Sequence, residues 1–238
     1  MFSIPHILFM VFTVISICII NKKTVNKDMT KLLKFIAIII VFFDPVFWLY
    51  SIYVSKHINY STIHSLYICS LFWMLFPFAM FIRNNNSTFK RIALSMCATV
   101  VILSGSMGIL FNTYVAQGMI NFPTIRSLLY HYLMMLAMSL LWSQKIYVPE
   151  KRDKYLSFIP VVVLVVVCYV VNIFTGWDYC YTAGGMGTPF NILFNIVNFI
   201  VPIPVVSKIV YLIIVYTTYY FLNTSIINFA MKKNGKNQ

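Results

Sequence analysis

A cysteine and a histidine, Cys69 and His131, could together form a nucleophile and its base. Each lies in a long apolar stretch, residues 63–82 and 125–146, that we predict to be a membrane-spanning helix. Both lie six residues in from the same predicted side of the membrane, which at roughly 1.5 Å per residue is about 9 Å below the boundary. A thiol and an imidazole at one depth could meet inside a bundle, as a Cys nucleophile with a His base requires.

Each of these residues also has a structural interpretation, and the sequence leaves both interpretations open. A free Cys within a membrane helix commonly packs as a small apolar residue. A single His in a span can simply hydrogen bond to a neighbouring helix.

Other polar residues share the predicted outer half of the membrane and are candidates to support the pair. Polar groups at this depth are costly and often functional. The supporting candidates are Tyr67, Asn172, Asp178 and Tyr179. Two cations near outer span ends, Arg126 and Lys208, could hold a lipid phosphate or could snorkel to the interface.

An acidic residue, Asp44, lies near the middle of the second predicted span, immediately before Pro45. A carboxyl group at this depth could be protonated, paired or part of an ion path. It could equally cap backbone groups that the proline leaves free. The sequence does not distinguish these interpretations.

The composition indicates the elements that position these residues. Of the 238 residues, 61% are hydrophobic and only 10% are charged, whereas a typical soluble domain is about 25% charged. Since a span needs roughly 20 apolar residues, most of the chain is used by helices. We therefore predict an all-α integral membrane protein, a single bundle over residues 1–238, with about seven transmembrane helices. The predicted spans are 4–20, 33–54, 63–82, 92–114, 125–146, 156–174 and 205–229.

One further stretch, residues 184–204, is rich in glycine and proline around an apolar run at 190–201. That run has about 12 residues and is too short to cross a bilayer. We predict an interfacial or re-entrant segment, which is tolerated where it packs on protein.

The distribution of basic residues predicts the orientation. Loops 21–34, 83–91 and 145–155 and the tail after 231 carry five, three, four and three of the 18 Lys and Arg residues. Cytoplasmic loops are enriched in Lys and Arg, so the N-terminus is expected outside and the C-terminus in the cytoplasm. The first 20 residues carry no Lys or Arg, which argues against a signal peptide.

The same analysis limits the partners. The net charge of +13 is explained by topology, and no basic soluble module is present to bind nucleic acid. The five cysteines form no CxxC pair, so no metal site is predicted. We expect membrane lipid as the partner and a cell membrane location, and the richness in Ile, Asn, Lys and Phe indicates a bacterial source.

The chain resembles the YwaF family of multi-pass membrane proteins, which is related to transmembrane protein 164. Residues 65–71, Ser-Leu-Tyr-Ile-Cys-Ser-Leu, match a family segment reading roughly Pro-Leu-His-Leu-Cys-Ser-Leu, and Leu-Tyr-His at 129–131 matches its fifth-span histidine. Asn172, the segment Gly-Trp-Asp-Tyr at 176–179 and the following prolines match in order. The resemblance covers residues 33–225. Tyr67 and Asp178 depart from the His and Asn usual in the family.

The resemblance implies a lipid acyltransferase or acyl hydrolase in which Cys69 accepts the acyl chain and His131 acts as base, with no cofactor. Two other functions stay open from the residues alone. Asp44 before a proline and the broken stretch 184–204 are also typical of a small-solute or proton-coupled transporter. A structural membrane protein is the third possibility.

Overall fold

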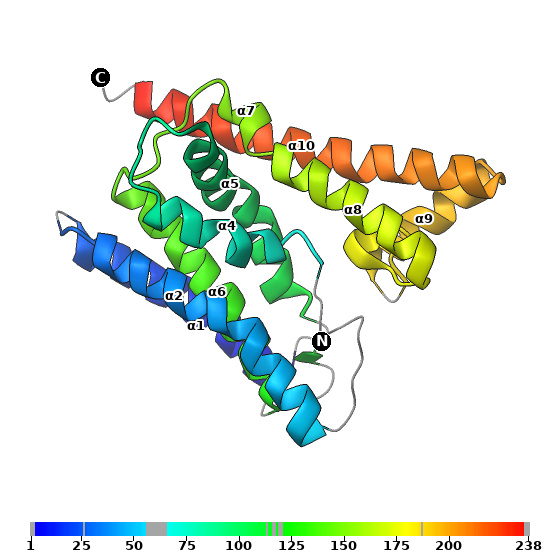
Figure 1. The fold of residues 1–238 in the computed structure, drawn as a ribbon, viewed down its shortest axis with the longest axis horizontal. Coiled ribbons are helices and arrows are strands. Elements are labelled where there is room, and N and C mark those ends of the chain that lie inside the picture. The colour runs from blue at the N-terminus through cyan, green and yellow to red at the C-terminus, as the bar shows by residue number, and fades with distance from the viewer. Residues whose placement is uncertain are drawn as a thin grey trace.

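The structure is a computed structural model that describes residues 3–25, 27–55, 66–112, 114–115, 118, 121–186 and 188–235. Within these residues all regular elements are helical (Figure 1). The elements are α1 (Ile4–Thr24), α2 (Thr30–Tyr50), η1 (Ser51–Ser55), α4 (Ser70–Phe81), α5 (Thr88–Leu110), α6 (Phe122–Ser143), α7 (Asp153–Leu156), α8 (Ile159–Thr175), η3 (Tyr179–Tyr181), α9 (Pro189–Ile200) and α10 (Pro204–Gly235).

Six of the described helical stretches are long and apolar enough to cross a membrane. They agree within four residues at each end with six of the predicted spans. The prediction of an all-α membrane protein is therefore confirmed. The six stretches are Ile4–Thr24, Thr30–Val54, Thr88–Leu110, Phe122–Ser143, Asp153–Thr175 and Pro204–Lys232.

The third predicted span, 63–82, differs in the structure. Its first residues lie outside the described part of the chain, and residues 66–69 form tight turns before α4 begins at Ser70. The Ser70 amide donates to Tyr67 O at 2.9 Å, and the Tyr67 amide donates to Ser70 Oγ at 3.4 Å. A serine hydroxyl that accepts from nearby backbone favours a turn over a continuing helix. Cys69 consequently lies at the N-terminus of a helix of 12 residues and not within a helix that starts at residue 63.

The glycine- and proline-rich stretch also contains a short helix. α9 has 12 residues and begins with Pro189 in its first turn, a position where proline costs no hydrogen bond. It matches the length of the apolar run expected at 190–201. Its placement at the membrane interface or within the bilayer stays a prediction.

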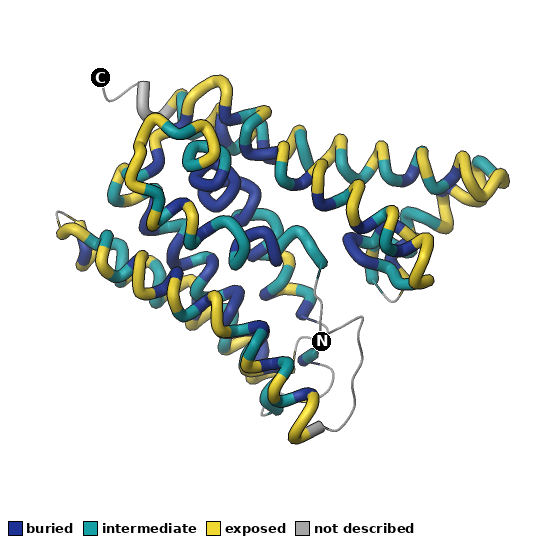
Figure 2. Tube along the Cα trace, viewed as in Figure 1, coloured by how far each residue is buried: buried dark blue, intermediate teal, exposed yellow. Residues whose placement is uncertain are grey.

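α5 is the central helix of the bundle and packs against α4 and α6 (Figure 2). It is lined by small residues, and Ala93, Cys97 and Ala98 are fully buried. A Cβ atom at Gly105 would come within 2.8 Å of Met135 Sδ on α6. Small side chains allow membrane helices to approach closely. At Gly105 the backbone of α5 therefore packs directly against the Met135 side chain of α6.

The outer helices expose apolar side chains. Large hydrophobic residues along α1, α8 and α10 are more than half exposed, among them Leu8, Val163, Val166 and Phe221. Soluble proteins rarely expose contiguous apolar patches of this extent. These faces therefore contact membrane lipid.

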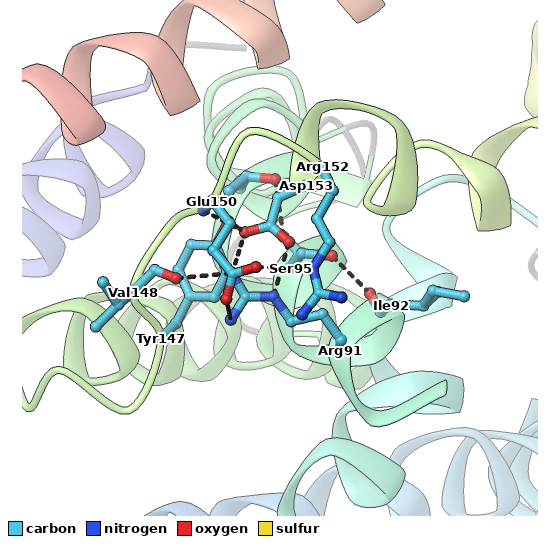
Figure 3. Close-up of polar contacts among 9 residues, drawn as sticks. Arg91, Ile92, Ser95, Tyr147, Val148, Glu150, Arg152 and Asp153 are labelled. Atoms are coloured by element: carbon cyan, nitrogen blue, oxygen red, sulfur yellow. Dashed lines mark hydrogen bonds and ion pairs between the residues drawn. The ribbon is translucent and has the colours of Figure 1, made fainter. Parts of the chain in front are cut away.

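A buried ion-pair cluster fixes the loop before α8 onto α5 (Figure 3). Arg91 donates to both carboxylate oxygens of Asp153, which is fully buried, and to Val148 O. The Tyr147 hydroxyl donates to the same carboxylate at 2.9 Å. Burial raises the pKa of Tyr147, so its hydroxyl remains protonated as a donor. Glu150 completes the cluster with an ion pair to Arg91 at 3.3 Å.

The basic segments gather at one end of the bundle, at the upper left of Figure 1. Ser143 and Gln144 at the end of α6 hydrogen bond to Asn21 and Thr24 at the end of α1. Near the α10 tail, Asn223 donates to the Ser157 hydroxyl at 2.8 Å. Which end faces the cytoplasm stays a prediction, but the predicted cytoplasmic loops do lie together.

Candidate functional site

The Cys69 thiol lies at the N-terminus of α4. Its backbone is helical, with φ −62° and ψ −29°, and its side chain is partly exposed. Its carbonyl accepts from the Tyr130 hydroxyl at 2.7 Å and from the Phe72 amide at 3.1 Å. The N-terminus of a helix carries partial positive charge, and such positions favour the thiolate form of a cysteine. Cys69 therefore lies where the partial positive charge of the α4 N-terminus reaches it.

Tyrosine rings surround the turn that precedes Cys69. The Tyr67 ring centroid lies 5.4 Å from that of Tyr181 and 6.2 Å from that of Tyr179. Tyr181 in turn stacks on Phe190 of α9 at 4.8 Å. Aromatic pairs at these separations attract one another beyond their buried area. They bring the segment after α8 and the start of α9 against the start of α4.

Asn172 organises that segment. Its Nδ2 donates to Tyr179 O at 2.9 Å and to Thr182 Oγ1 at 2.7 Å, and its Oδ1 accepts from the Tyr179 amide at 3.0 Å. All of the contacts that the structure gives to this side chain go to the segment itself. Asn172 therefore shapes the loop next to the Cys69 turn, and its support of a Cys–His pair stays a prediction.

The Asp178 side chain also holds the segment after α8 in shape. Its carboxylate accepts from the amides of Ala183, Gly185 and Met186 at 2.7, 2.6 and 3.2 Å. The loop it holds is strained, because Cys180 and Tyr181 have φ of 50° and 59°. Non-glycine residues rarely adopt this left-handed region, and such strain persists only where the surroundings hold it.

His131 lies beyond Tyr130 on α6, with the two ring centroids 5.3 Å apart. Its Nδ1 lies 2.7 Å from Ser127 O, and since a carbonyl can only accept, Nδ1 carries the proton. That tautomer leaves Nε2 as the basic nitrogen. The ring packs directly on Gly108 of α5, where a Cβ atom would clash with it. Among the described residues, no hydrogen bond joins His131 to Cys69.

Asp44 and Arg126 form a buried ion pair between α2 and α6. The Arg126 guanidinium donates to Asp44 Oδ1 and to Phe43 O, and it lies 4.5 Å from the ring centroid of Phe47. The side chains are only 10% and 12% exposed. Of the interpretations open for Asp44, the structure supports pairing.

The other outer cation, Lys208, lies half-buried on α10. Within the part of the chain that the structure describes, it has no ion pair. Contact of Arg126 or Lys208 with a lipid headgroup stays a prediction. Across the same residues, no three His, Cys, Asp or Glu side chains converge as metal ligands.

Trp73 is a residue that the sequence analysis did not consider. It follows Cys69 by four residues and so shares its helix face. Long side chains on a helix point back toward its N-terminus, which directs the indole toward the level of Cys69. Its Nε1 is buried and has no acceptor among the described residues. The i, i+4 spacing from Cys69 was the signal that could have identified it.

The model of the TMEM164 family matches residues 1–227 of this chain. This match confirms the predicted relation to transmembrane protein 164. No curated protein and no solved structure matches the chain. The YwaF name and the bacterial source stay predictions.

Proposed function

Because the chain belongs to the TMEM164 family, we propose that it is a membrane-embedded lipid acyltransferase or acyl hydrolase of the cell membrane. In this proposal Cys69 is the nucleophile and His131 is its base. The observation that carries it is the position of Cys69 at the N-terminus of α4, beside Tyr130 and the buried Asp44–Arg126 pair. A helix N-terminus is one of the surroundings that favour the thiolate form of a cysteine.

His131 has the tautomer that a base needs, with Nδ1–H held by Ser127 O. Its Nε2 is not hydrogen bonded to Cys69 in this structure. Catalytic hydrogen bonds are often long without substrate and tighten in the reactive complex. Tyr130 joins the two residues, since it neighbours His131 in sequence and donates to the Cys69 carbonyl.

The reaction proceeds in two balanced steps. His131 Nε2 takes the thiol proton as Cys69 Sγ attacks the ester carbonyl of a phospholipid; the C–O bond breaks, and the departing oxygen receives the proton. This leaves a thioester on Cys69 and a lysophospholipid. In the second step a lysophospholipid hydroxyl or water attacks the thioester, its proton passes through His131, and the thiolate leaves.

Trp73 could donate its indole N–H to the oxygen that becomes negative during the attack. A buried donor without a competing acceptor is suited to this task, and removing one such donor typically slows a reaction 10²–10³-fold. We expect Trp73→Phe, which removes the N–H donor but leaves an aromatic ring, to slow acylation of Cys69 by about 100-fold. Single-turnover acylation with labelled phospholipid measures this.

The matched control is Trp142→Phe. This variant also removes an indole N–H. Trp142 lies near the C-terminal end of α6, and its indole N–H donates to Ala98 O on α5. That variant is expected to acylate at the native rate when folded. An unchanged rate in Trp73→Phe would exclude Trp73 as the donor without affecting the assignment of Cys69.

The test of the proposed function is intact mass spectrometry of the purified protein after exposure to labelled phospholipid. We expect an acyl mass on the native chain that hydroxylamine removes. Cys69→Ala should show no such mass, and His131→Gln should acquire it at least about 100-fold more slowly, in line with the loss of a general base. An adduct that persists in Cys69→Ala would contradict the proposal.

A second candidate function is transport of a small solute. It is favoured by the buried Asp44–Arg126 pair beside Pro45 and by the two short apolar helices α4 and α9, since broken helices and intramembrane charges line transporter sites. Solute uptake into proteoliposomes that survives in Cys69→Ala and is lost in Asp44→Asn, with no acyl adduct, would support transport.

A further inference from the structure

Two buried thiols converge on one backbone carbonyl three residues before Cys69. Cys168 Sγ on α8 lies 3.5 Å from Leu66 O, and Cys180 Sγ in the loop after α8 lies 3.2 Å from the same oxygen. Their residues are 0% and 2% exposed. Since both sulfurs contact one atom, they are near neighbours.

The backbone at Cys180 is held in an unusual conformation. Its φ of 50° lies in the left-handed region, which non-glycine residues rarely adopt. The Tyr216 hydroxyl on α10 donates to Cys180 O at 2.7 Å, and the Tyr211 hydroxyl donates to Tyr181 O at 3.0 Å. The loop is thus fixed by side chains from α8 and α10, with the Cys180 side chain directed at Leu66 and Cys168.

We propose that Cys168 and Cys180 are a disulfide site that, when oxidised, locks the loop 178–186 onto α8 beside the Cys69 turn. The oxidant is a disulfide: one thiolate attacks it to give a mixed disulfide, and the other thiolate then displaces the remaining half. Two thiols of the oxidant are released, and two electrons pass to it. The bond requires only a short approach of two sulfurs that already share an acceptor.

Oxidation would change the surroundings of Cys69 without touching it. Leu66 O would lose its two S–H donors, and the segment carrying Tyr179 and Tyr181 would be joined covalently to α8. These rings pack on Tyr67. The disulfide would therefore stiffen one wall of the proposed site. The proposed Cys168–Cys180 disulfide does not depend on the chemistry proposed for Cys69.

The experiment uses the full chain in nonionic detergent, reduced, freed of reductant and then exposed to oxidised glutathione. Peptide mapping without reduction is expected to recover a Cys168–Cys180 cross-link. Hydrogen exchange over 176–186 should slow by about tenfold or more, because a disulfide removes open conformations. Cys168→Ala and Cys180→Ala should each abolish the cross-link and the slowing.

The proposal is overturned if Cys168 and Cys180 both remain open to maleimide after denaturation of the oxidised protein. It is also overturned if the cross-link joins Cys180 to Cys69. Since the assay reads thiols and not acyl transfer, its outcome is independent of the proposed function.

Discussion

Asp44→Ala is expected to destabilise the protein in detergent by about 3–5 kcal/mol, because it leaves the Arg126 guanidinium buried without its counter-ion. The side chain of Arg126 is 12% exposed, and its remaining contacts are a backbone carbonyl and the Phe47 ring. A guanidinium cannot lose its charge in a protein. The loss should appear as a lower melting temperature in fluorescence-detected size-exclusion chromatography.

The reverse variant, Arg126→Ala, should cost less, since a lone carboxyl group in an apolar site can become neutral by taking a proton. The double variant Asp44→Asn, Arg126→Gln should recover most of the lost stability, because no uncompensated charge remains. Lys208→Ala is the matched control: it removes a cation at the same predicted level that has no ion pair within the described residues, and it should change stability by less than about 0.5 kcal/mol. Equal, small losses in all four variants would show that the pair carries little energy.

The ion pair also bears on the proposed chemistry, because it joins α2 to the turn of α6 that precedes Tyr130 and His131. Phe43, whose carbonyl accepts from Arg126, packs its ring 5.7 Å from that of Tyr130. Tyr130 in turn holds the Cys69 carbonyl. A chain of contacts thus runs from the ion pair to the nucleophile, and variants of Asp44 should be tested for folding before any loss of activity is interpreted.

The sequence predicted well what depends on local composition. Long apolar runs gave six crossing helices within a few residues, since only helices satisfy their backbone within lipid. The gathering of basic loops at one end follows from the same pattern. The boundary of α4 was missed, because its start depends on the Ser70 hydroxyl, which accepts from the Tyr67 amide, and on turns at 66–69 that apolar content does not reveal.

Long-range pairing was the part that could not be predicted. The chain has only five acidic residues, and all five are engaged. They are Asp28 at the start of α2, Asp44 with Arg126, Glu150 and Asp153 with Arg91, and Asp178 in its loop. Asp28 and Asp178 act locally. The hydrogen bonds of Asp28 with Thr30 hold the pKa of this exposed carboxyl below its usual value.

The structure brings several of the predicted site residues close together, but their roles stay predictions. Cys69 and the segment at 129–131 do lie together, but the direct contact is made by Tyr130 and not by His131. Depth along a helix fixes which residues share a level, whereas the direction of a side chain depends on helix rotation, which boundary errors obscure. Asn172, Asp178 and Tyr179 surround the site by shaping its neighbouring loop, a role that their spacing does not indicate.

Asp153→Ala should have the second large effect, a loss of about 3–5 kcal/mol, because Asp153 is the fully buried partner of Arg91. Its carboxylate accepts from Arg91, the Tyr147 hydroxyl and the Glu150 amide (Figure 3). Removing the carboxylate leaves the Tyr147 hydroxyl and the Arg91 guanidinium without this acceptor. Each hydrogen bond that is no longer made adds to the loss of stability. Asp153→Asn keeps the shape and some acceptor capacity, so its loss should be intermediate.

Glu150→Gln is the control that separates burial from charge. Glu150 pairs with the same arginine but its side chain is 47% exposed, and exposed pairs contribute about 0–1 kcal/mol. Thermal melting of the three variants in one detergent, repeated at high salt, tests the difference. High salt should reduce the difference in melting temperature between the native protein and Glu150→Gln. It should leave the difference between the native protein and Asp153→Ala unchanged, because buried pairs are screened much less. If Glu150→Gln proved as harmful as Asp153→Ala, the cluster would act through its exposed charges, and ionic strength would tune how firmly the loop 145–152 is held on α5.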